Sequence, residues 1–457
     1  MGDGVRENCG IFGCFGVHEA SNKAFWAGWA LQHRGEESAG IVSSDGNELY
    51  SRIRMGLIAT PGNFDRDILI ETLPGNSAIS HTRYSTMGNS TLKNAQPIIV
   101  DGKHKMAIAH NGTLVDTDKT RINLITEGVV FSSETDSELI AQKFARSSKD
   151  SLDERVYDCL DGIRGAFSLA ILTKDALIGV RDGFRPLVIG KLGEGICIAS
   201  ETCALDAIKA DYVRDVRPGE FIVVNNESLK TQDKFYSFDL GFQNPFCIFE
   251  EVYFARPDSI INGVFVNELR FEFGRSLARS CPAKADIVAA ILDSGYHAAL
   301  GFSEESKIPY KDVYVRNHYT GRGFINPRQS ERESVNSIKL NIMRNAVKDK
   351  RIILVDDSIV RGNTTQGRIN DLKAAGAKEV HLRISCPPHE YPCFYGIDFP
   401  TQNELAFNKF GKSIENIREF LGADSLCYLP LDDMLNVAQK TGYKHCAACW
   451  NGNYPVK

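Results

Sequence analysis

An apolar stretch that runs directly into two acids constrains the fold of this chain more than any other feature. Residues 352–355 are Ile, Ile, Leu and Val, and Asp356 and Asp357 follow them at once. In open α/β sheets, ligands bind at the carboxyl ends of such strands. The next residues, 358–365, are rich in Ser, Gly and Thr, so their N–H groups and hydroxyls can surround a phosphate at a helix N-terminus. The pattern favours a sugar-phosphate site over a solvated acidic turn, because adjacent carboxylates can accept hydrogen bonds from vicinal hydroxyls.

This run resembles the 5-phosphoribosyl-1-pyrophosphate (PRPP) motif of phosphoribosyltransferases. The resemblance implies that Asp356 and Asp357 fix the ribose. It also implies that the following loop encloses the 5-phosphate, with contributions from Ser358, Arg361, Gly362, Asn363 and Thr364.

The pattern of elements changes near residues 243–245, which indicates at least two domains in a chain of 457 residues. Residues 9–235 contain short β-rich runs separated by Gly, Asn and Asp, with helical patterns between them, and this predicts a sheet-rich layered domain. Further on, predicted strands at 351–355 and 379–384 flank a predicted helix at 365–375. That order is typical of a parallel sheet with right-handed crossovers.

Composition excludes several classes of protein. The net charge is −5, and no basic tract with interleaved aromatics is present, so we expect no nucleic-acid partner. Neither a membrane-spanning apolar run nor a secretory signal is visible, so we expect no membrane association and a cytoplasmic location. The 12 cysteines are scattered rather than dense, which indicates a reducing compartment. A special cysteine is then expected to be a nucleophile or a metal ligand.

Cys9 opens the first predicted strand, where a lone cysteine would usually be a small buried apolar residue. Four further motifs follow in order, at residues 31–40, 81–86, 110–112 and 133–138. Together they resemble the N-terminal-nucleophile (Ntn) glutaminase domain of class II glutamine amidotransferases. The resemblance implies that Cys9 is a nucleophile freed by removal of a propeptide, residues 1–8. Its own α-amino group, with a pKa of about 8, would then serve as the base.

The same resemblance assigns roles to the other motifs. Asn111 and Gly112 would form the oxyanion hole, and Arg34 and Gly35 would line the nucleophile. Glutamine would be bound through three residues: Arg83 on its α-carboxylate, Asp136 on its α-ammonium, and Thr86. Taken singly, Arg83 could instead be a surface ion-pair residue, and Asn111-Gly112 a plain hairpin turn. No such motifs accompany Cys14, which is predicted to lie in the core.

Three stretches of the second half extend the PRPP motif. Residues 293–295 follow a predicted strand and could cradle pyrophosphate, residues 316–325 suit a lid, and a further cation follows. The predicted binding residues here are Asp293, Ser294, Gly295, Arg316, Tyr319 and Lys339. In this order, and with the glutaminase motifs, they resemble the amidophosphoribosyltransferase family over essentially the whole chain.

That resemblance implies the activity. Glutamine, PRPP and water would give 5-phosphoribosylamine, glutamate and pyrophosphate, the first committed step of purine synthesis, with ammonia passing between two sites of one chain. Mg²⁺ bound through Ser294, Asp356 and Asp357 would neutralise the leaving pyrophosphate. A homo-oligomer, either tetramer or dimer, and feedback inhibition by purine nucleotides are also implied.

Four cysteines suggest a metal centre. Cys446 and Cys449 alone could be a redox pair or half of a zinc site. With Cys247 and Cys393 they resemble the [4Fe–4S] ligands of the iron–sulfur subgroup of the family, although four thiolates suit zinc equally well on chemical grounds. Cys386 matches no ligand position.

The expected architecture is therefore mixed α/β and α+β. A four-layer αββα Ntn-hydrolase glutaminase domain is predicted at 9–240, and a type I phosphoribosyltransferase domain with a central parallel sheet at 241–420. A tail with cluster ligands follows at 421–457. Departures from the family pattern at Glu36, Thr113, Leu292 and Arg316 motivate one alternative, a catalytically weak regulatory paralogue that binds PRPP. A class II amidotransferase making a sugar amine or asparagine is disfavoured by the PRPP motif.

Overall fold

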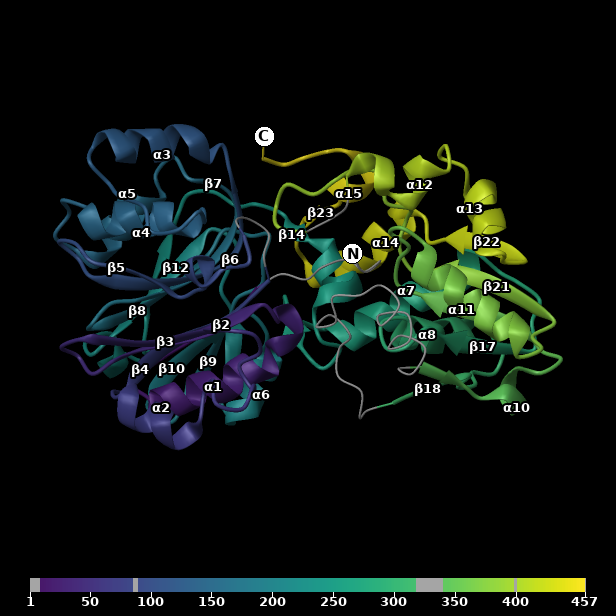
Figure 1. The fold of residues 1–457 in the computed structure, drawn as a ribbon, viewed down its shortest axis with the longest axis horizontal. Coiled ribbons are helices and arrows are strands. Elements are labelled where there is room, and N and C mark those ends of the chain that lie inside the picture. Colours follow the sequence, from purple (N-terminus) through teal and green to yellow (C-terminus); the bar gives the residue numbers. More distant parts are fainter. Residues whose placement is uncertain (1–8, 85–88, 318–339, 398–400, 457) are drawn as a thin grey trace.

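The computed structural model describes residues 9–84, 89–317, 340–397 and 401–456. The predictions for the propeptide 1–8 and for Thr86, Tyr319 and Lys339 lie outside these residues. Figure 1 shows two lobes, one built from the first half of the chain and one from the second, with β14 (Phe246–Cys247) and β23 (His445–Cys446) between them.

The first lobe has four layers (Figure 1), as predicted. One sheet has the order β11-β9-β10-β1-β4-β2-β3 and the other β13-β12-β8-β7-β6-β5. The first contains β1 (Gly10–Phe15), β2 (Ser38–Ser44), β3 (Leu49–Met55), β4 (Ser77–Arg83), β9 (Val188–Leu192), β10 (Gly195–Ala199) and β11 (Asp211–Asp215). The second contains β5 (Ile98–Val100), β6 (Met106–Val115), β7 (Arg164–Leu172), β8 (Ala176–Arg181), β12 (Glu220–Asn225) and β13 (Tyr236–Asp239).

Helices cover the outer face of each sheet. The first sheet carries α1 (Ala20–Ala30), α2 (Arg66–Thr72) and α6 (Thr202–Ile208), and the second carries α3 (Thr117–Thr126), α4 (Ser137–Arg146) and α5 (Leu152–Leu160). Strand β1 is apolar along its whole length because both of its faces are covered. Ile11 packs into the core between the sheets, while Phe12 and Cys14 pack beneath α1. Cys14 is therefore a core residue, as predicted.

The second lobe contains a parallel sheet in the order β17-β20-β21-β22. Its strands are β17 (Ile287–Ala290), β20 (Arg351–Asp356), β21 (Glu379–Ile384) and β22 (Ser425–Tyr428). The helices are α7 (Val266–Ser280), α8 (Tyr296–Ser306), α10 (Arg344–Val347), α11 (Asn363–Ala374), α12 (Ala406–Lys409), α13 (Ile414–Leu421), α14 (Leu431–Ala438) and α15 (Ala448–Asn451). An antiparallel pair, β18 (Tyr314–Arg316) and β19 (Leu340–Ile342), stands apart from this sheet.

Strand β22 corrects a predicted boundary. It pairs with β21 as the fourth strand of the sheet, although its residues fall in the segment predicted as a tail from 421. The strand has four residues at the sheet edge, and only Tyr428 is fully buried, so its apolar pattern is weak. The sheet-bearing domain therefore continues past residue 420.

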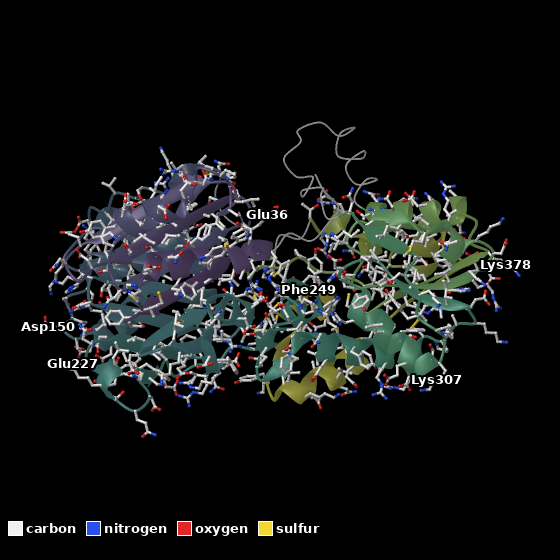
Figure 2. The ribbon with its side chains drawn as sticks, turned by 90° about the horizontal axis from the view of Figure 1, so that it is seen from below. Glu36, Asp150, Glu227, Phe249, Lys307 and Lys378 are labelled. Carbon is white, nitrogen blue, oxygen red and sulfur yellow. A yellow bond between two sulfur atoms is a disulfide. The ribbon has the colours of Figure 1, made fainter. Side chains whose placement is uncertain are left out.

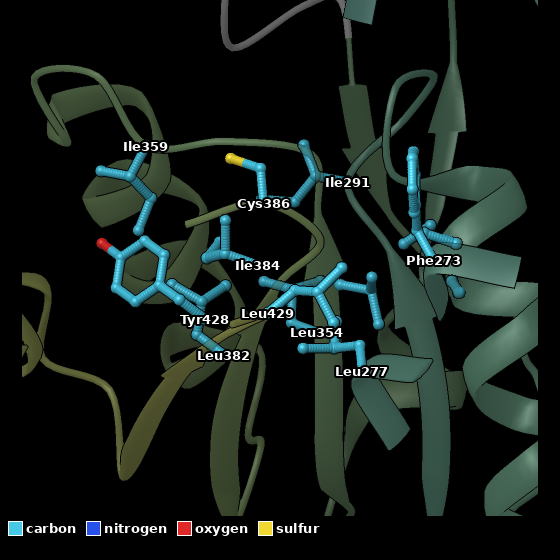
Figure 3. Packing of buried hydrophobic residues seen from close by; sticks show 14 of the residues in the cluster. Phe273, Leu277, Ile291, Leu354, Ile359, Leu382, Ile384, Cys386, Tyr428 and Leu429 are labelled. Atoms are coloured by element: carbon cyan, nitrogen blue, oxygen red, sulfur yellow. The ribbon is translucent and has the colours of Figure 1, made fainter. Parts of the chain in front are cut away.

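The core of this lobe packs α7 against the sheet. Figure 3 shows Leu354 of the sheet beside Leu277 of α7, and Leu382, Ile384 and Phe273 belong to the same buried cluster. Beyond the end of α7, Cys281 forms a disulfide with Cys427 of β22, with an S–S distance of 1.99 Å. The spacing of the cysteines gave no indication of this pairing.

Short elements join the lobes. Strand β14 (Phe246–Cys247) pairs in parallel with β23 (His445–Cys446), so residues far apart in sequence meet here. A π-helical turn, Glu250–Phe254, follows β14, and Figure 2 shows Phe249 between the lobes. The remaining elements are β15 (Ile260–Ile261), β16 (Val264–Phe265) and the 3-10 turns Gln32–Arg34, Leu92–Asn94, Ser228–Lys230, Gln402–Glu404 and Gln439–Thr441. In the described part of the chain, no helix has both the length and the apolar character needed to cross a membrane.

Candidate active sites

Cys9 lies immediately before β1, which belongs to the first of the two sheets of the first lobe. Its side chain is buried, and its Sγ donates to the carbonyl of Tyr84 at 3.4 Å. Burial raises the pKa of the Cys9 thiol to about 11, because the opposing effects of the Tyr84 hydrogen bond and of the Arg83 and Arg34 charges are smaller. The thiol is therefore protonated at neutral pH and needs a base to act as a nucleophile.

Asn111 and Gly112 lie within β6, which excludes the alternative of a hairpin turn. The Asn111 side chain is completely buried, and neither its Oδ1 nor its Nδ2 has a hydrogen-bond partner among the described residues. A buried amide of this kind suits a donor that serves a reacting group. Gly112 has φ +143°, and a Cβ there would stand 2.0 Å from the Ala166 carbonyl oxygen, so only glycine fits this strand.

Arg83 ends β4, next to Tyr84 and hence close to Cys9. It is buried and pairs with Glu37 at 3.1 Å, so the surface ion-pair alternative is wrong. A buried guanidinium can bind a carboxylate with two parallel hydrogen bonds, as expected for the α-carboxylate of glutamine.

Asp136 precedes α4, and its side chain contacts β6, the strand that contains Asn111. Its Oδ2 accepts from the Leu114 N–H at 2.7 Å. His81 in β4 donates from Nε2 to the His110 carbonyl at 3.1 Å and so joins the two sheets one residue before Asn111. The structure thus brings the predicted glutaminase residues of both sheets together.

Arg34 contacts the Cys9 backbone, and Gly35 lies close to β4. A Cβ on Gly35 would lie 2.6 Å from the Thr82 carbonyl oxygen, so β4 approaches this residue closely. Arg34 is buried and donates from Nε to the Cys9 carbonyl at 3.1 Å. Its place is therefore against the Cys9 backbone rather than in open solvent.

The second candidate site lies at the carboxyl end of β20, as the sequence predicted. Asp356 ends the strand, and both it and Asp357 are buried. Burial, followed by the charge of Asp357, raises the pKa of Asp356 well above its usual range. Ser358 donates to Asp357 at 2.5 Å, and Gly362, with φ +90°, leads into α11 at Asn363.

The predicted pyrophosphate loop faces these acids. Ser294 donates to Asp356 at 3.5 Å, and a Cβ on Gly295 would stand 2.4 Å from the Val355 carbonyl oxygen. Arg316, at the end of β18, pairs with Asp293 of the same loop. Residues 293–295, Arg316 and the acids therefore surround one end of the sheet, while Arg361 reaches Glu404 at 3.6 Å.

The four predicted ligand cysteines gather at the junction of the lobes. Cys247 of β14 and Cys446 of β23 are register partners, and Cys449 lies in α15. Cys393 accepts from the Tyr395 N–H at 3.3 Å. The thiols lie close enough to act on one another electrostatically, and burial raises the pKa of Cys446 to about 12. As these side chains stand, the described residues contain no group of three Cys, His, Asp or Glu able to hold a single metal ion.

Sequence reasoning missed the charged residues that connect these sites. Glu201 follows β10, Glu250 opens the π-helical turn and Arg185 follows β8, and all three are completely buried. The one signal in the sequence was a carboxylate three residues after Cys247.

Comparisons with known proteins agree with this geometry. A family model described as a glutamine amidotransferase domain matches residues 81–207. The amidophosphoribosyltransferase of Archaeoglobus fulgidus is 42% identical, with 98% of each chain covered. The chloroplastic one of Glycine max is 43% identical over 99% of this chain and 79% of its own length. The solved glutamine PRPP amidotransferase of B. subtilis, complexed with ADP and GMP, has a TM-score of 0.89 at 37% identity, covering 98% of both chains.

The chain belongs to the amidophosphoribosyltransferase family. As a member of this family it catalyses glutamine-dependent amidotransfer to PRPP in purine biosynthesis. The first lobe is its Ntn glutaminase domain and the second its phosphoribosyltransferase domain. Similarity over nearly the full chain does not favour a paralogue that only binds PRPP.

Proposed function

We propose that the amidotransferase reaction runs as two half-reactions at the two sites described above. In the first, Cys9 Sγ attacks the carboxamide carbon of glutamine, and the oxyanion that forms accepts hydrogen bonds from Asn111 Nδ2 and the Gly112 N–H. The C–N bond then breaks as the leaving nitrogen takes up the proton removed from Sγ, ammonia leaves, and water hydrolyses the thioester to glutamate and restores the thiol. The observation that carries this assignment is the buried Asn111 amide without a partner among the described residues, one residue after His110, whose carbonyl accepts the hydrogen bond from β4.

The base of this half-reaction is proposed to be the α-amino group of Cys9. A thiol with a pKa of about 11 cannot supply enough thiolate at neutral pH by itself. An α-amino group, with a pKa of about 8, is partly unprotonated there and can take the proton from Sγ. Residues 1–8 must first be removed to expose it. Intact mass of an active preparation tests this step, because a full-length mass together with glutaminase activity would contradict it.

In the second half-reaction, ammonia displaces pyrophosphate at C1 of the ribose. We assign Asp356 and Asp357 to the ribose hydroxyls, residues 358–364 to the 5-phosphate and residues 293–295 with Arg316 to the pyrophosphate. Ser294, Asp356 and Asp357 offer only oxygen donors close together, which fits Mg²⁺. Bound Mg²⁺ would neutralise charge on the leaving pyrophosphate.

The assignment of the two halves is tested by changing the nitrogen source. In Cys9→Ser, pyrophosphate release from PRPP and glutamine should disappear, while release with ammonium chloride as nitrogen source should remain. In Asp357→Asn both should fall, and glutamine hydrolysis should persist. Equal loss of both activities in Cys9→Ser would show that the sites are not divided in this way.

The cysteine quartet is proposed to hold a [4Fe–4S] cluster with a structural role. Support comes from four buried or partly buried thiols that converge from β14, β23, α15 and the loop containing Cys393. Four thiolates are the usual ligand set of such a cluster. Iron, sulfide and zinc should be measured in protein purified without oxygen. About four irons and four sulfides per chain are expected, and a colourless zinc protein would contradict the proposal.

Regulation, assembly and location are also proposals. We expect a homo-oligomer, either tetramer or dimer, that is inhibited by purine nucleotides and located in the cytoplasm. The nucleotide proposal is supported by the B. subtilis relative, whose solved complex contains ADP and GMP. Light scattering tests the assembly, titration of the reaction with AMP, ADP and GMP tests the inhibition, and fractionation of the source cells tests the location.

A further inference from the structure

One carboxylate of the second lobe lies between two arginines of the first. Glu250 opens the π-helical turn, and its two oxygens each accept from Arg34 Nη2 at 2.9 Å. Arg185 Nη1 donates to Glu250 Oε1 at 3.0 Å. All three side chains are buried, so water and salt screen these ion pairs far less than pairs at the surface.

Arg34 carries this contact to the nucleophile. Its Nε donates to the Cys9 carbonyl at 3.1 Å, and its Nη1 donates to Glu201 at 2.6 Å. Burial alone would lower the pKa of Arg34, but the carboxylates of Glu250 and Glu201 outweigh it and hold the pKa above its usual range. The guanidinium is thus a permanent cation. Its three partners are the carboxylates of Glu250 and Glu201 and the carbonyl of Cys9.

The turn that contains Glu250 is also held by hydrogen bonds from the phosphoribosyltransferase domain. Arg270 of α7 donates to the carbonyls of Glu251 at 2.8 Å and Ala255 at 2.7 Å. Burial lowers the pKa of Arg270 to about 10, and the nearby charge of Asp357 opposes this shift. Arg270 therefore holds the turn while lying within electrostatic reach of a PRPP-site acid. π-Helical turns often mark functional positions of this kind.

The other arginine connects the same carboxylate to the cysteine loop. Arg185 Nη2 donates to the Tyr395 carbonyl at 2.6 Å. A Cβ on the next residue, Gly396, would stand 3.3 Å from Arg185 Nη2 and 3.3 Å from the Gly112 carbonyl carbon. The loop containing Cys393 thus packs directly against the glycine of the proposed oxyanion hole.

From these contacts we propose that Glu250 is a positioning residue for the glutaminase half-reaction, supplied by the phosphoribosyltransferase domain. Glu250 holds Arg34, and Arg34 holds the Cys9 backbone at a fixed place relative to Asn111. This inference rests on the proposed role of Cys9 as nucleophile. Glutamine itself is bound elsewhere, through Arg83 and Asp136. Loss of Glu250 should therefore lower the glutaminase kcat much more than it changes the KM for glutamine.

The experiment compares three variants of the two-domain protein, each confirmed by intact mass to have lost residues 1–8. Glu250→Gln removes the charge and keeps the shape, and Glu250→Asp keeps the charge. Thr202→Val is the matched control, since it removes another hydrogen bond of the junction, the partly buried one that Thr202 Oγ1 accepts from the Ile260 N–H at 2.8 Å. Each is assayed for glutaminase kcat and KM, and for pyrophosphate release with ammonium chloride as the nitrogen source.

In Glu250→Gln, a shift of the nucleophile by about 1 Å is expected to lower the glutaminase kcat about 100-fold. The KM for glutamine and the ammonia-dependent activity should stay within about threefold. Glu250→Asp should recover part of the loss, and Thr202→Val should resemble the wild type. An unchanged kcat in Glu250→Gln, no recovery in Glu250→Asp, or parallel loss of both activities in Glu250→Gln and Thr202→Val would overturn the proposal.

Failure of the underlying assignment has a different signature. If Cys9→Ser still hydrolyses glutamine, the nucleophile assignment is wrong, whatever the Glu250 variants do. If Cys9→Ser is inactive and Glu250→Gln is fully active, only the role of Glu250 is wrong.

Discussion

Arg83 donates to the carboxylate of Glu37 at 3.1 Å, so the arginine assigned to the α-carboxylate of glutamine already holds an anion of the same type. Glu37 lies on the loop before β2, and its partner ends β4. The ion pair holds Nη1 of the Arg83 guanidinium, so the guanidinium is oriented before glutamine binds. Pre-orientation of this kind lowers the entropy lost on binding.

Arg83→Lys should raise the KM for glutamine, because a lysine cannot make two parallel hydrogen bonds to one carboxylate. Loss of one charge-assisted hydrogen bond corresponds to about 10- to 100-fold in KM, with a smaller change in kcat. Steady-state glutaminase kinetics measure both quantities. Arg52→Lys, on β3 of the same sheet, serves as the control and should leave KM unchanged. Similar KM values for both variants would refute the role given to Arg83.

Asn111→Ala should lower the glutaminase kcat about 100- to 1000-fold, which is the usual effect of removing one oxyanion donor. Ammonia-dependent pyrophosphate release should be retained, because Asn111 belongs to the first half-reaction only. Asn123→Ala on the exposed face of α3 is the control. A glutaminase kcat within about threefold of the wild type in Asn111→Ala would exclude the amide as a donor.

Gly295→Ala should abolish the use of PRPP with either nitrogen source. The added Cβ would lie 2.4 Å from the Val355 carbonyl oxygen and 3.0 Å from the Asp356 Cα, so the loop and the acids cannot both keep their places. Gly367→Ala in α11 is the matched control, since nothing lies within 4 Å of its Cβ. That control should be active and about 1 kcal/mol more stable, because alanine is the better helix former. PRPP binding by calorimetry distinguishes the two, and normal binding in Gly295→Ala would contradict the proposed cradle.

His81 predicts a pH dependence of stability. Burial lowers the pKa of His81 to about 3 in the folded protein, whereas an unfolded histidine titrates near 6.5. Since the unfolded chain then binds the extra proton, this residue makes folding less favourable as the pH falls from about 6.5 towards 3, by about 1.4 kcal/mol per pH unit. Above about pH 6.5 it has no effect.

His81→Gln keeps an N–H donor for the His110 carbonyl and removes the titration. The free energy of unfolding of the variant, relative to the wild type, should improve by about 2 kcal/mol between pH 6.5 and 5. Urea denaturation at several pH values measures this difference. A difference that is constant with pH would mean that His81 is not held neutral by burial.

Motifs allowed the sequence to predict both sites and the order of the domains. The residues around Cys9, Asn111 and Asp356 are contiguous runs whose chemistry is readable without a structure. The four layers were expected from the resemblance to the Ntn glutaminase family, and β1, which is buried along its whole length, fits them because it is covered on both faces. The edge strand β22 was missed because four residues with weak burial carry almost no pattern.

The residues between the sites could not be predicted in the same way. Arg34 and Glu250 are 216 positions apart, and Arg34 and Glu201 are 167 apart, so no local pattern pairs them. A single glutamate in a sequence is expected at the surface, because an unpaired buried carboxylate is costly. Only the fold shows that each of these charges has its partner inside the protein.

The parallel pairing of β14 with β23 has a consequence for synthesis on the ribosome. Cys247 leaves the exit tunnel about two hundred residues before Cys446, while the glutaminase domain ahead of it is free to fold as a unit. The junction cannot close, and the four thiols cannot meet, until the strand at residues 445–446 has emerged. A metal centre held by all four thiols can therefore form only after this strand has emerged, and nascent chains that stall before it would accumulate with an open junction.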